Sequence, residues 1–373
     1  MSDHSSPLQM TSAPGARTHI NHRELDYFCG TGYYALHNHP DMIAAAHQAM
    51  DQYGIGSATT RSGFGNNPVL LDVEAKAAQF FDTEQALYYV SGYLGNAILL
   101  QGLSPQYDLI FVDEQAHYSV TDGAAMARKP IITFAHCNPQ DLADKLQAHC
   151  QAGQRPLVIT DGIFPTSGVI PPLLKYHELL NSIEGAILCV DDAHATGVLG
   201  KKGQGTFEYC GVSGPRRYSS GTLSKALGGH GGIIAGTAEF VQGLQNNSMI
   251  VSGSSSVPVP AAAASAKALE IIQAQPQLRE QLWANVARAK KAFRALGFEN
   301  IPDTPVPIIC LSGEGLDLSG IQQRLFEQGM ATFYVPSGSY SSVPEGGAIR
   351  IAIFSSHSAL QIDALVEAVR QCL

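Results

Sequence analysis

The stretch "AILCVDDAHATG", residues 186–197, decides the fold. Its first five residues are apolar, and two aspartates and a histidine follow almost at once. A continuous apolar run of this length, bounded by polar residues, is typical of a β-strand that is covered on both faces. Strands of this kind belong to mostly parallel sheets, and ligands of open α/β sheets bind at the carboxyl ends of the strands.

Similar β-rich runs lie on both sides of this stretch and alternate with helical segments over about residues 85–236. These runs end at Val90, Val112, Phe134, Thr160, Ser220 and Gly236. The alternation predicts an α/β doubly wound domain with a mostly parallel central sheet. Two helices are expected before the sheet, beginning near Pro40 and Pro68, because proline suits the first helical position.

The last part of the chain has a different pattern. Two helices are expected at about 258–274 and 277–296, and the residues after them read as strand, helix, strand, strand and helix. This order predicts a smaller α+β domain. We therefore expect an N-terminal segment (1–40), a large domain (41–257), and a C-terminal small domain with its connecting helices (258–373).

The composition excludes several classes of protein. The 373 residues are 45% hydrophobic and 15% charged, which is typical of a well-packed globular protein. The net charge of −9 comes without a Lys/Arg block, so we expect no nucleic-acid and no membrane-surface partner. No run approaches the roughly 20 apolar residues of a membrane span. Residues 1–17 lack the pattern of a signal peptide, which favours a cytoplasmic protein.

The cysteines give no sign of a disulfide framework or a metal centre. The seven cysteines are odd in number and show neither a CxxC motif nor Cys/His metal spacing. We therefore expect reduced thiols and no metal.

Three segments that follow expected strands carry residues suited to chemistry. "SGYLGN", residues 91–96, combines a glycine with a helix start, which makes an anion site or a plain strand-to-helix turn. "DEQAHYSVTDG", residues 113–123, contains His117, and such a histidine is either functional or structural. In "VDDAHATG" the residues Asp191, Asp192 and His194 suit a metal, an acid/base pair or a cofactor clamp.

The fourth segment is "SSGTLSKALGGHGG", residues 219–232. Lys225 lies between hydroxyl residues and a glycine-rich run, so a cofactor ring can approach it and phosphate oxygens can be bound nearby. A carboxylate such as Asp191, facing a pyridine nitrogen, would keep that nitrogen protonated and make the ring an electron sink. Together the four segments predict a phosphate turn, a stacking histidine, a pyridinium carboxylate and a Schiff-base lysine.

This ordered set resembles the fold type I pyridoxal-phosphate enzymes, and within them the α-oxoamine synthase family. The likeness runs from about Asp26 to the C-terminus. It implies pyridoxal 5′-phosphate as the cofactor, held as a Schiff base on Lys225. It further implies that Asp191 contacts the ring nitrogen, that His194 contacts the ring hydroxyl, and that His117 stacks on the ring.

The resemblance implies further contacts. The phosphate contacts would be Ser91, Gly92, Tyr93, Thr222 and Ser224. In "GGAIRIAIFSSH", residues 346–357, Arg350 would grip the substrate carboxylate. Family members are homodimers with a shared active site, and Ser254 or Ser255 would reach the phosphate in the neighbouring chain.

Two residues depart from the family pattern. Pro165 in "DGIFPTSG" stands where relatives carry a serine that helps to hold the ring hydroxyl. Thr31 in "TGYYAL" stands where relatives carry an asparagine that helps to position the substrate carboxylate. Both departures bear on the identity of the substrate.

The reaction implied by the resemblance is a decarboxylative Claisen condensation. A small amino acid would react with an acyl thioester, on CoA or on an acyl carrier, and give an α-aminoketone. Aminotransfer on the same scaffold is the alternative. A catalytically silent relative that serves as a partner subunit is a further one, since a fold does not fix a function.

Overall fold

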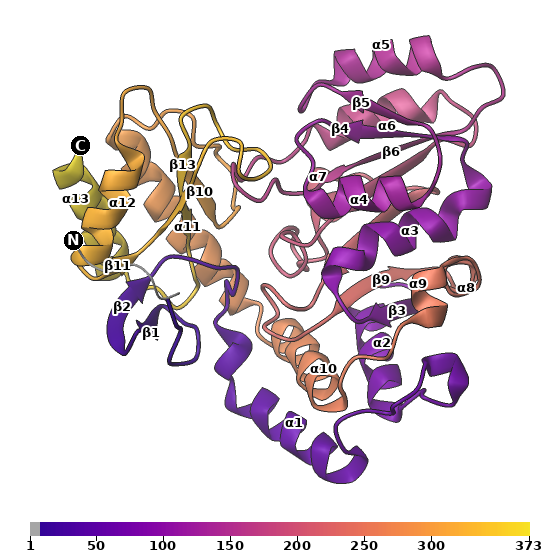
Figure 1. The fold of residues 1–373 in the computed structure, drawn as a ribbon, viewed down its shortest axis with the longest axis horizontal. Helices are drawn as coiled ribbons and strands as arrows, with labels where there is room; N and C mark the ends of the chain where they lie inside the picture. Colours follow the sequence, from indigo (N-terminus) through magenta and orange to yellow (C-terminus); the bar gives the residue numbers. More distant parts are fainter. Residues whose placement is uncertain (1–7) are drawn as a thin grey trace. The chain divides into compact units, whose positions relative to one another are not determined.

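The computed structural model describes residues 8–373 and divides them into two compact units (Figure 1). The large unit consists of Pro40–Pro165 and Val169–Pro276, and the small unit of the described residues up to His39, Thr166–Gly168 and Gln277–Leu373. Residues 1–7 of the expected N-terminal segment lie outside the described residues. The boundaries expected from the sequence stay a prediction. In the structure, residues 8–39 group with the small unit, and the helix α10 (Val259–Ala274) groups with the large one, where it packs on α1 (Pro40–Tyr53).

A seven-stranded sheet forms the centre of the large unit, in the order β3-β9-β8-β7-β6-β4-β5. Its strands are β3 (Gln85–Tyr89), β4 (Leu109–Asp113), β5 (Ile131–Phe134), β6 (Pro156–Asp161), β7 (Ile187–Asp191), β8 (Arg217–Thr222) and β9 (Gly232–Gly236). The strands from β8 to β5 run parallel to one another, whereas β9 runs antiparallel to β8 and β3. Every residue of β4, β6 and β7 is buried, as their apolar runs predict. The predicted mostly parallel α/β sheet is confirmed.

Helices cover both faces of this sheet. Besides α1, which packs on α10, and α10, which packs on α2, the helices of the large unit are α2 (Pro68–Phe80), α3 (Gly95–Leu103), α4 (Tyr118–Met126), α5 (Pro139–His149), α6 (Leu173–Asn181), α7 (Thr206–Cys210), α8 (Ala238–Asn247) and α9 (Met249–Gly253). On one face α3 packs on α4 and α8, and on the other α5 packs on α6. A separate apolar core lies under each group of helices. The helices α1 and α2 begin at Pro40 and Pro68, as predicted.

The small unit contains two three-stranded sheets. One is made of β1 (Arg17–Ile20), β2 (Arg23–Tyr27) and β11 (Met330–Ala331), and the other of β10 (Ile308–Leu311), β13 (Ala348–Ala352) and β12 (Phe333–Val335). Its helices are α11 (Gln277–Ala295), α12 (Leu318–Glu327) and α13 (Ala359–Cys372). The sequence did not predict the β1–β2 hairpin, because both strands are mostly polar. No helix in the described part of the chain has the length and hydropathy needed to cross a bilayer.

Candidate active site

Four neighbouring parallel strands deliver polar residues to one edge of the central sheet. The strand β4 ends at Asp113, β6 at Asp161, β7 at Asp191 and β8 at Thr222. All four residues are buried. Because the carboxyl ends of parallel strands meet at the same edge, these side chains are gathered there. The predicted ligand edge is therefore also the place where the structure buries its carboxyl groups.

The carboxylate of Asp191 is fixed by three hydrogen-bond donors. Its Oδ2 accepts hydrogen bonds from Asn96 Nδ2 at 2.6 Å and from Ser119 Oγ at 3.0 Å, and its Oδ1 accepts one from the Ala193 amide at 2.9 Å. Asn96 is held in turn, because Ser220 Oγ donates to its Oδ1 at 2.9 Å. The helix starts of α3 and α4, which carry Asn96 and Ser119, thus set the orientation of a carboxylate at the end of β7.

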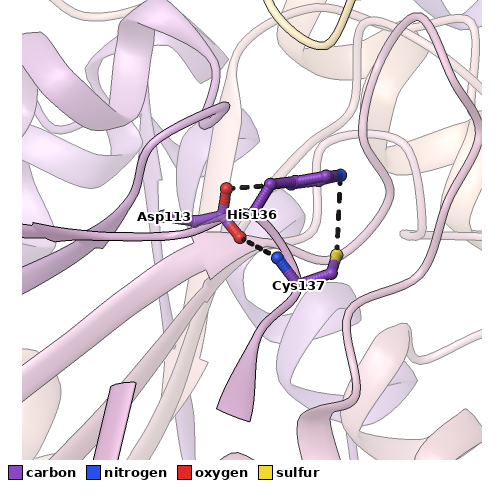
Figure 2. Close-up of side chains that lie close together, drawn as sticks. All are labelled: Asp113, His136 and Cys137. Atoms are coloured by element: carbon purple, nitrogen blue, oxygen red, sulfur yellow. Dashed lines mark hydrogen bonds and ion pairs between the residues drawn. The ribbon is translucent and has the colours of Figure 1, made fainter. Parts of the chain in front are cut away.

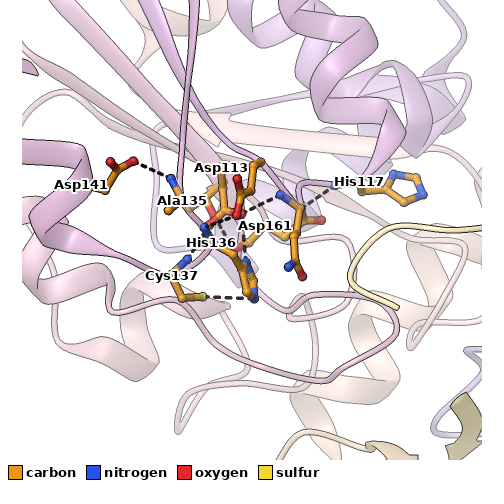
Figure 3. A network of polar contacts seen from close by, with 10 residues as sticks. Asp113, His117, Ala135, His136, Cys137, Asp141 and Asp161 are labelled. Carbon is orange, nitrogen blue, oxygen red and sulfur yellow. Dashed lines mark hydrogen bonds and ion pairs between the residues drawn. The ribbon is translucent and has the colours of Figure 1, made fainter. Parts of the chain in front are cut away.

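The imidazole of His117 is joined to the same group. His117 caps the N-terminus of α4, where its Nδ1 accepts from the Ser119 amide at 3.1 Å. Its backbone N–H donates to Asp161 Oδ2 at 2.8 Å (Figure 3). Since Nδ1 is an acceptor, the proton of the neutral ring lies on Nε2. Ser119 Oγ lies 2.7 Å from Nδ1 and so connects His117 to Asp191.

Two pKa shifts describe the electrostatics at this edge. Burial lowers the pKa of His117, the Asp191 carboxylate raises it, and the Lys225 ammonium lowers it further. Burial, and next the charge of Asp191, raises the pKa of Asp161 well above its usual range. His117 and Asp161 thus each lie within electrostatic range of both Asp191 and Lys225.

The turn after β3 touches the lysine segment. Residues Gly92–Leu94 form one turn of 3₁₀ helix that leads into α3. A Cβ on Gly92 would lie 2.6 Å from Thr222 Oγ1, so only glycine allows this approach. The Ser224 amide donates to Thr222 Oγ1 at 3.2 Å, and the half-buried Lys225 follows. The two segments that were predicted to contact the phosphate are thus in direct contact.

Close packing explains why glycines follow Lys225. A Cβ on Gly229 would lie 2.4 Å from Ser265 Oγ of α10, and one on Gly232 would lie 2.2 Å from the ring of Tyr89. From the sequence, these glycines were expected to let a cofactor ring approach. The structure shows that they also let the lysine loop pack on α10 and β3.

The remaining predicted residues of the large unit occupy different settings. His194 is buried in the turn after β7. Ser91 precedes the 3₁₀ turn, and the Tyr93 hydroxyl donates to the Asp122 carboxylate, with its ring 6.1 Å from that of His117. Ser254 and Ser255 follow α9, and Ser255 pairs with the backbone of Thr60.

Arg350 and Thr31 belong to the small unit. Arg350 lies in β13, is 9% exposed, and donates from Nη1 to the Gly30 carbonyl at 3.1 Å. Arg350 is also hydrogen-bonded to the Tyr33 side chain. Burial raises the pKa of the Tyr33 hydroxyl to about 12, although Arg350 has a lowering effect on it. Thr31 follows Gly30 directly. The guanidinium therefore leaves its apolar strand toward the segment that contains Thr31.

The sequence analysis missed the residues that orient Asp191 and His117. They are Asn96, Ser119, Asp161 and Ser220. Each lies at the end of a strand or in the first turn of the helix after it, and each carries a short polar side chain. That position and polarity are the signal that could have identified them.

This set of groups fits pyridoxal phosphate. The oriented carboxylate of Asp191 suits a basic ring nitrogen, and the neutral imidazole of His117 suits a ring face. The helix start after the turn at Gly92, in contact with the Thr222 hydroxyl, suits a phosphate. Lys225 supplies an amine at the same edge.

Comparison with known proteins supports this reading. The chain matches the aminotransferase class I and II family over residues 29–369. It is 36% identical over 354 residues to an 8-amino-7-oxononanoate synthase from Trichlorobacter lovleyi, covering 94% of this chain and 89% of that protein. It is 35% identical over 344 residues to the 2-amino-3-ketobutyrate coenzyme A ligase of Escherichia coli K12, covering 91% and 85%. A solved serine palmitoyltransferase of Sphingomonas wittichii has a TM-score of 0.89 at 25% identity, covering 98% and 91%.

The chain thus belongs to the aminotransferase class I and II family and is a fold type I, pyridoxal-phosphate-dependent transferase. Within that class it is a member of the α-oxoamine synthase family. The fold class, the family and the cofactor predicted from the sequence are confirmed.

Proposed function

We propose that this enzyme joins the α-carbon of a small amino acid to an acyl thioester, with loss of carbon dioxide, and releases an α-aminoketone. The observation that carries the proposal is the match, over more than nine tenths of the chain, to relatives named as an 8-amino-7-oxononanoate synthase and a 2-amino-3-ketobutyrate coenzyme A ligase. The acyl group would arrive on CoA or on an acyl carrier.

Pyridoxal phosphate, when bound, supplies an electron sink for charge that develops at the α-carbon. Lys225 would hold it through its amine, Asp191 would bind its ring nitrogen, and His194 would bind its ring hydroxyl. The phosphate would lie against Ser91, Gly92, Tyr93, Thr222 and Ser224. This assignment is supported by the contact between Gly92 and Thr222 and by the donors that fix Asp191.

Lys225 would carry out the proton transfer, and the neighbouring residues would orient Asp191 and His117. The Lys225 amine removes the proton from the α-carbon of the amino acid. Ser119 has one hydroxyl proton and donates it to Asp191, which leaves His117 Nδ1 to accept from the Ser119 amide. His117 therefore stays neutral, and its uncharged ring face does not repel a protonated cofactor ring.

Substrate binding would depend on Arg350. Arg350 presents a planar fork that can grip a carboxylate through two bonds, which a lysine cannot copy. Thr31, next to the carbonyl that Arg350 contacts, would assist it. Pro165 offers no hydroxyl to the cofactor ring, so His194 would hold the ring hydroxyl without that help.

We further propose a homodimer with a shared active site in the cytoplasm. Phe64 is fully exposed, as its relative accessibility of 103% shows, and Ile55 nearby in the chain is 65% exposed. Contiguous exposed apolar patches are typical of contact surfaces, and we infer that Phe64 and Ile55 belong to one. Ser255 lies at this surface because it pairs with Thr60. A second copy covering the surface would let Ser254 or Ser255 reach its phosphate site.

A matrix of small amino acids against acyl-CoAs, read by mass spectrometry, tests the reaction. We expect an α-aminoketone and carbon dioxide only when both substrates are present, and none with the Lys225→Ala variant. An aminotransferase would instead convert the cofactor to its amine form and give a 2-oxo acid from the amino acid alone. That result would overturn the proposal, as would the absence of product in every combination.

A further inference from the structure

A second cluster of reactive side chains lies at the ends of β4 and β5, and β4 is two strands along the sheet from β7, which carries Asp191. The cluster consists of Asp113, His136 and Cys137 (Figure 2). Asp113 Oδ1 accepts a hydrogen bond from His136 Nδ1 at 2.9 Å, and its Oδ2 accepts one from the Cys137 amide at 2.9 Å. His136 Nε2 lies 3.6 Å from Cys137 Sγ. Since Nδ1 carries the donated proton, Nε2 carries the lone pair of the neutral ring and faces the Cys137 thiol.

The spacing of these two atoms matches tetrahedral metal coordination. Zinc–nitrogen bonds of about 2.0 Å and zinc–sulfur bonds of about 2.3 Å, at a tetrahedral angle, place the two ligand atoms roughly 3.5 Å apart. The observed separation of Nε2 and Sγ is 3.6 Å. A carboxylate on the other ring nitrogen, as Asp113 provides, is the usual partner of a metal-bound histidine.

We infer that His136 Nε2 and Cys137 Sγ form a binding site for a zinc-class divalent cation, with Asp113 orienting His136. On binding, the metal–sulfur bond replaces the S–H bond and the thiol proton leaves to water, so no electron is transferred. Water molecules complete the coordination.

The backbone holds the two ligands toward each other. Cys137 has φ 52°, in the left-handed region that few non-glycine residues occupy. The loop is fixed by bonds from the Ala135 amide to Asp141 Oδ2 at 2.7 Å and from the His136 amide to Glu114 Oε1 at 3.1 Å. Figure 3 shows Ala135 and Asp141 beside the cluster. The two adjacent side chains therefore face one another without any change in the loop.

The surroundings of the cluster favour a cation. The Asp113 carboxylate accepts hydrogen bonds from both His136 and Cys137. Its negative charge is buried beside the two ligand atoms and attracts a metal ion.

Cobalt(II), added to the holoenzyme, is the probe, because tetrahedral cobalt has visible bands at longer wavelength than the cofactor. We expect one cobalt per chain, displaced by one equivalent of zinc. Cys137→Asn and His136→Gln should each weaken cobalt binding at least about tenfold, on the scale of changes around metal sites. Asparagine is chosen at Cys137 because it tolerates a positive φ. Cys150→Ser, at a half-buried thiol outside the cluster, is the matched control and should bind as the wild type does.

Circular dichroism and cofactor absorbance check that each variant is folded. If Cys137→Asn fails to fold, His136→Gln decides the question alone. The inference is overturned if the wild type gives no tetrahedral cobalt spectrum. It is equally overturned if the spectrum survives in the folded variants or disappears in Cys150→Ser, because the metal then binds elsewhere.

Discussion

Replacing Asp191 by asparagine tests the centre of the proposed site with the smallest change of shape. Oδ2 accepts hydrogen bonds from Asn96 and Ser119, whereas Oδ1 accepts one from the Ala193 amide. The new NH₂ group takes the place of one of these oxygens. At the Oδ2 position it faces two donors, and at the Oδ1 position it faces one. The second orientation is therefore favoured, and one of three hydrogen bonds is lost.

The magnitude follows from that single lost bond. A hydrogen bond to a charged group contributes about 1.5–3 kcal/mol, so we expect the free energy of unfolding to fall by about 2 kcal/mol. Activity should fall much more, because a neutral amide cannot keep the cofactor's ring nitrogen protonated. We expect a kcat at least about 100-fold lower, the usual effect of losing a positioned acid/base partner.

Asp192→Asn is the matched control, since this neighbour is equally buried. Its carboxylate accepts from the Thr206 amide at 3.0 Å and from Thr206 Oγ1 at 2.5 Å. Burial raises the pKa of Asp192 from 3.8 to about 7. Because the folded state binds this proton more tightly than the unfolded one, the contribution of Asp192 to the free energy of unfolding falls as the pH rises from about 4 to 7. Asp192→Asn should flatten this dependence, seen by denaturant titration at several pH values.

The kcat values of the two variants decide the assignment. We expect Asp192→Asn to keep kcat within about threefold of wild type, because both oxygens of the Asp192 carboxylate are bound by Thr206. A loss in Asp192→Asn as large as that in Asp191→Asn would refute the reasoning, and so would near-wild-type turnover in Asp191→Asn. In the latter case a different group faces the ring nitrogen.

Three more predictions concern the remaining proposed residues. Lys225→Ala should lose the visible cofactor absorbance and essentially all turnover, because attachment and proton transfer use one amine; a wild-type protein that stays colourless with pyridoxal phosphate would contradict this role. Arg350→Lys should raise the amino-acid KM by roughly 10- to 100-fold while the cofactor still binds, matching the loss of one or two charge-assisted bonds; an unchanged KM would mean that the carboxylate is held elsewhere. Mixing Lys225→Ala with an inactive Ser254→Ala/Ser255→Ala double variant should restore part of the activity in hybrid dimers, and no recovery after proven subunit exchange would exclude a shared site.

The elements that the sequence predicted well are those whose burial requires a recognisable pattern of apolar residues in the sequence. The strands β4, β6 and β7 are buried throughout and read as continuous apolar runs. The hairpin of β1 and β2 was missed for the opposite reason. Its strands, "RTHI" and "RELDY", are mostly polar, and its turn uses Asn21 and His22 at positive φ without a glycine. The strand β2 pairs with β11, which lies far away in the chain. This pairing makes the hairpin part of the small unit.

The residues that orient Asp191 could not be named from the sequence, because their partnership depends on the order of strands in the sheet. Asn96 is 95 positions from Asp191, and Ser119 is 72 positions away. They meet because α3 and α4 pack on one another and begin at the same sheet edge. The need for such partners was nevertheless predictable, since a buried carboxylate without donors is costly. A carboxylate expected at a buried strand end therefore implies amides or hydroxyls in the first turns of the helices that follow neighbouring strands.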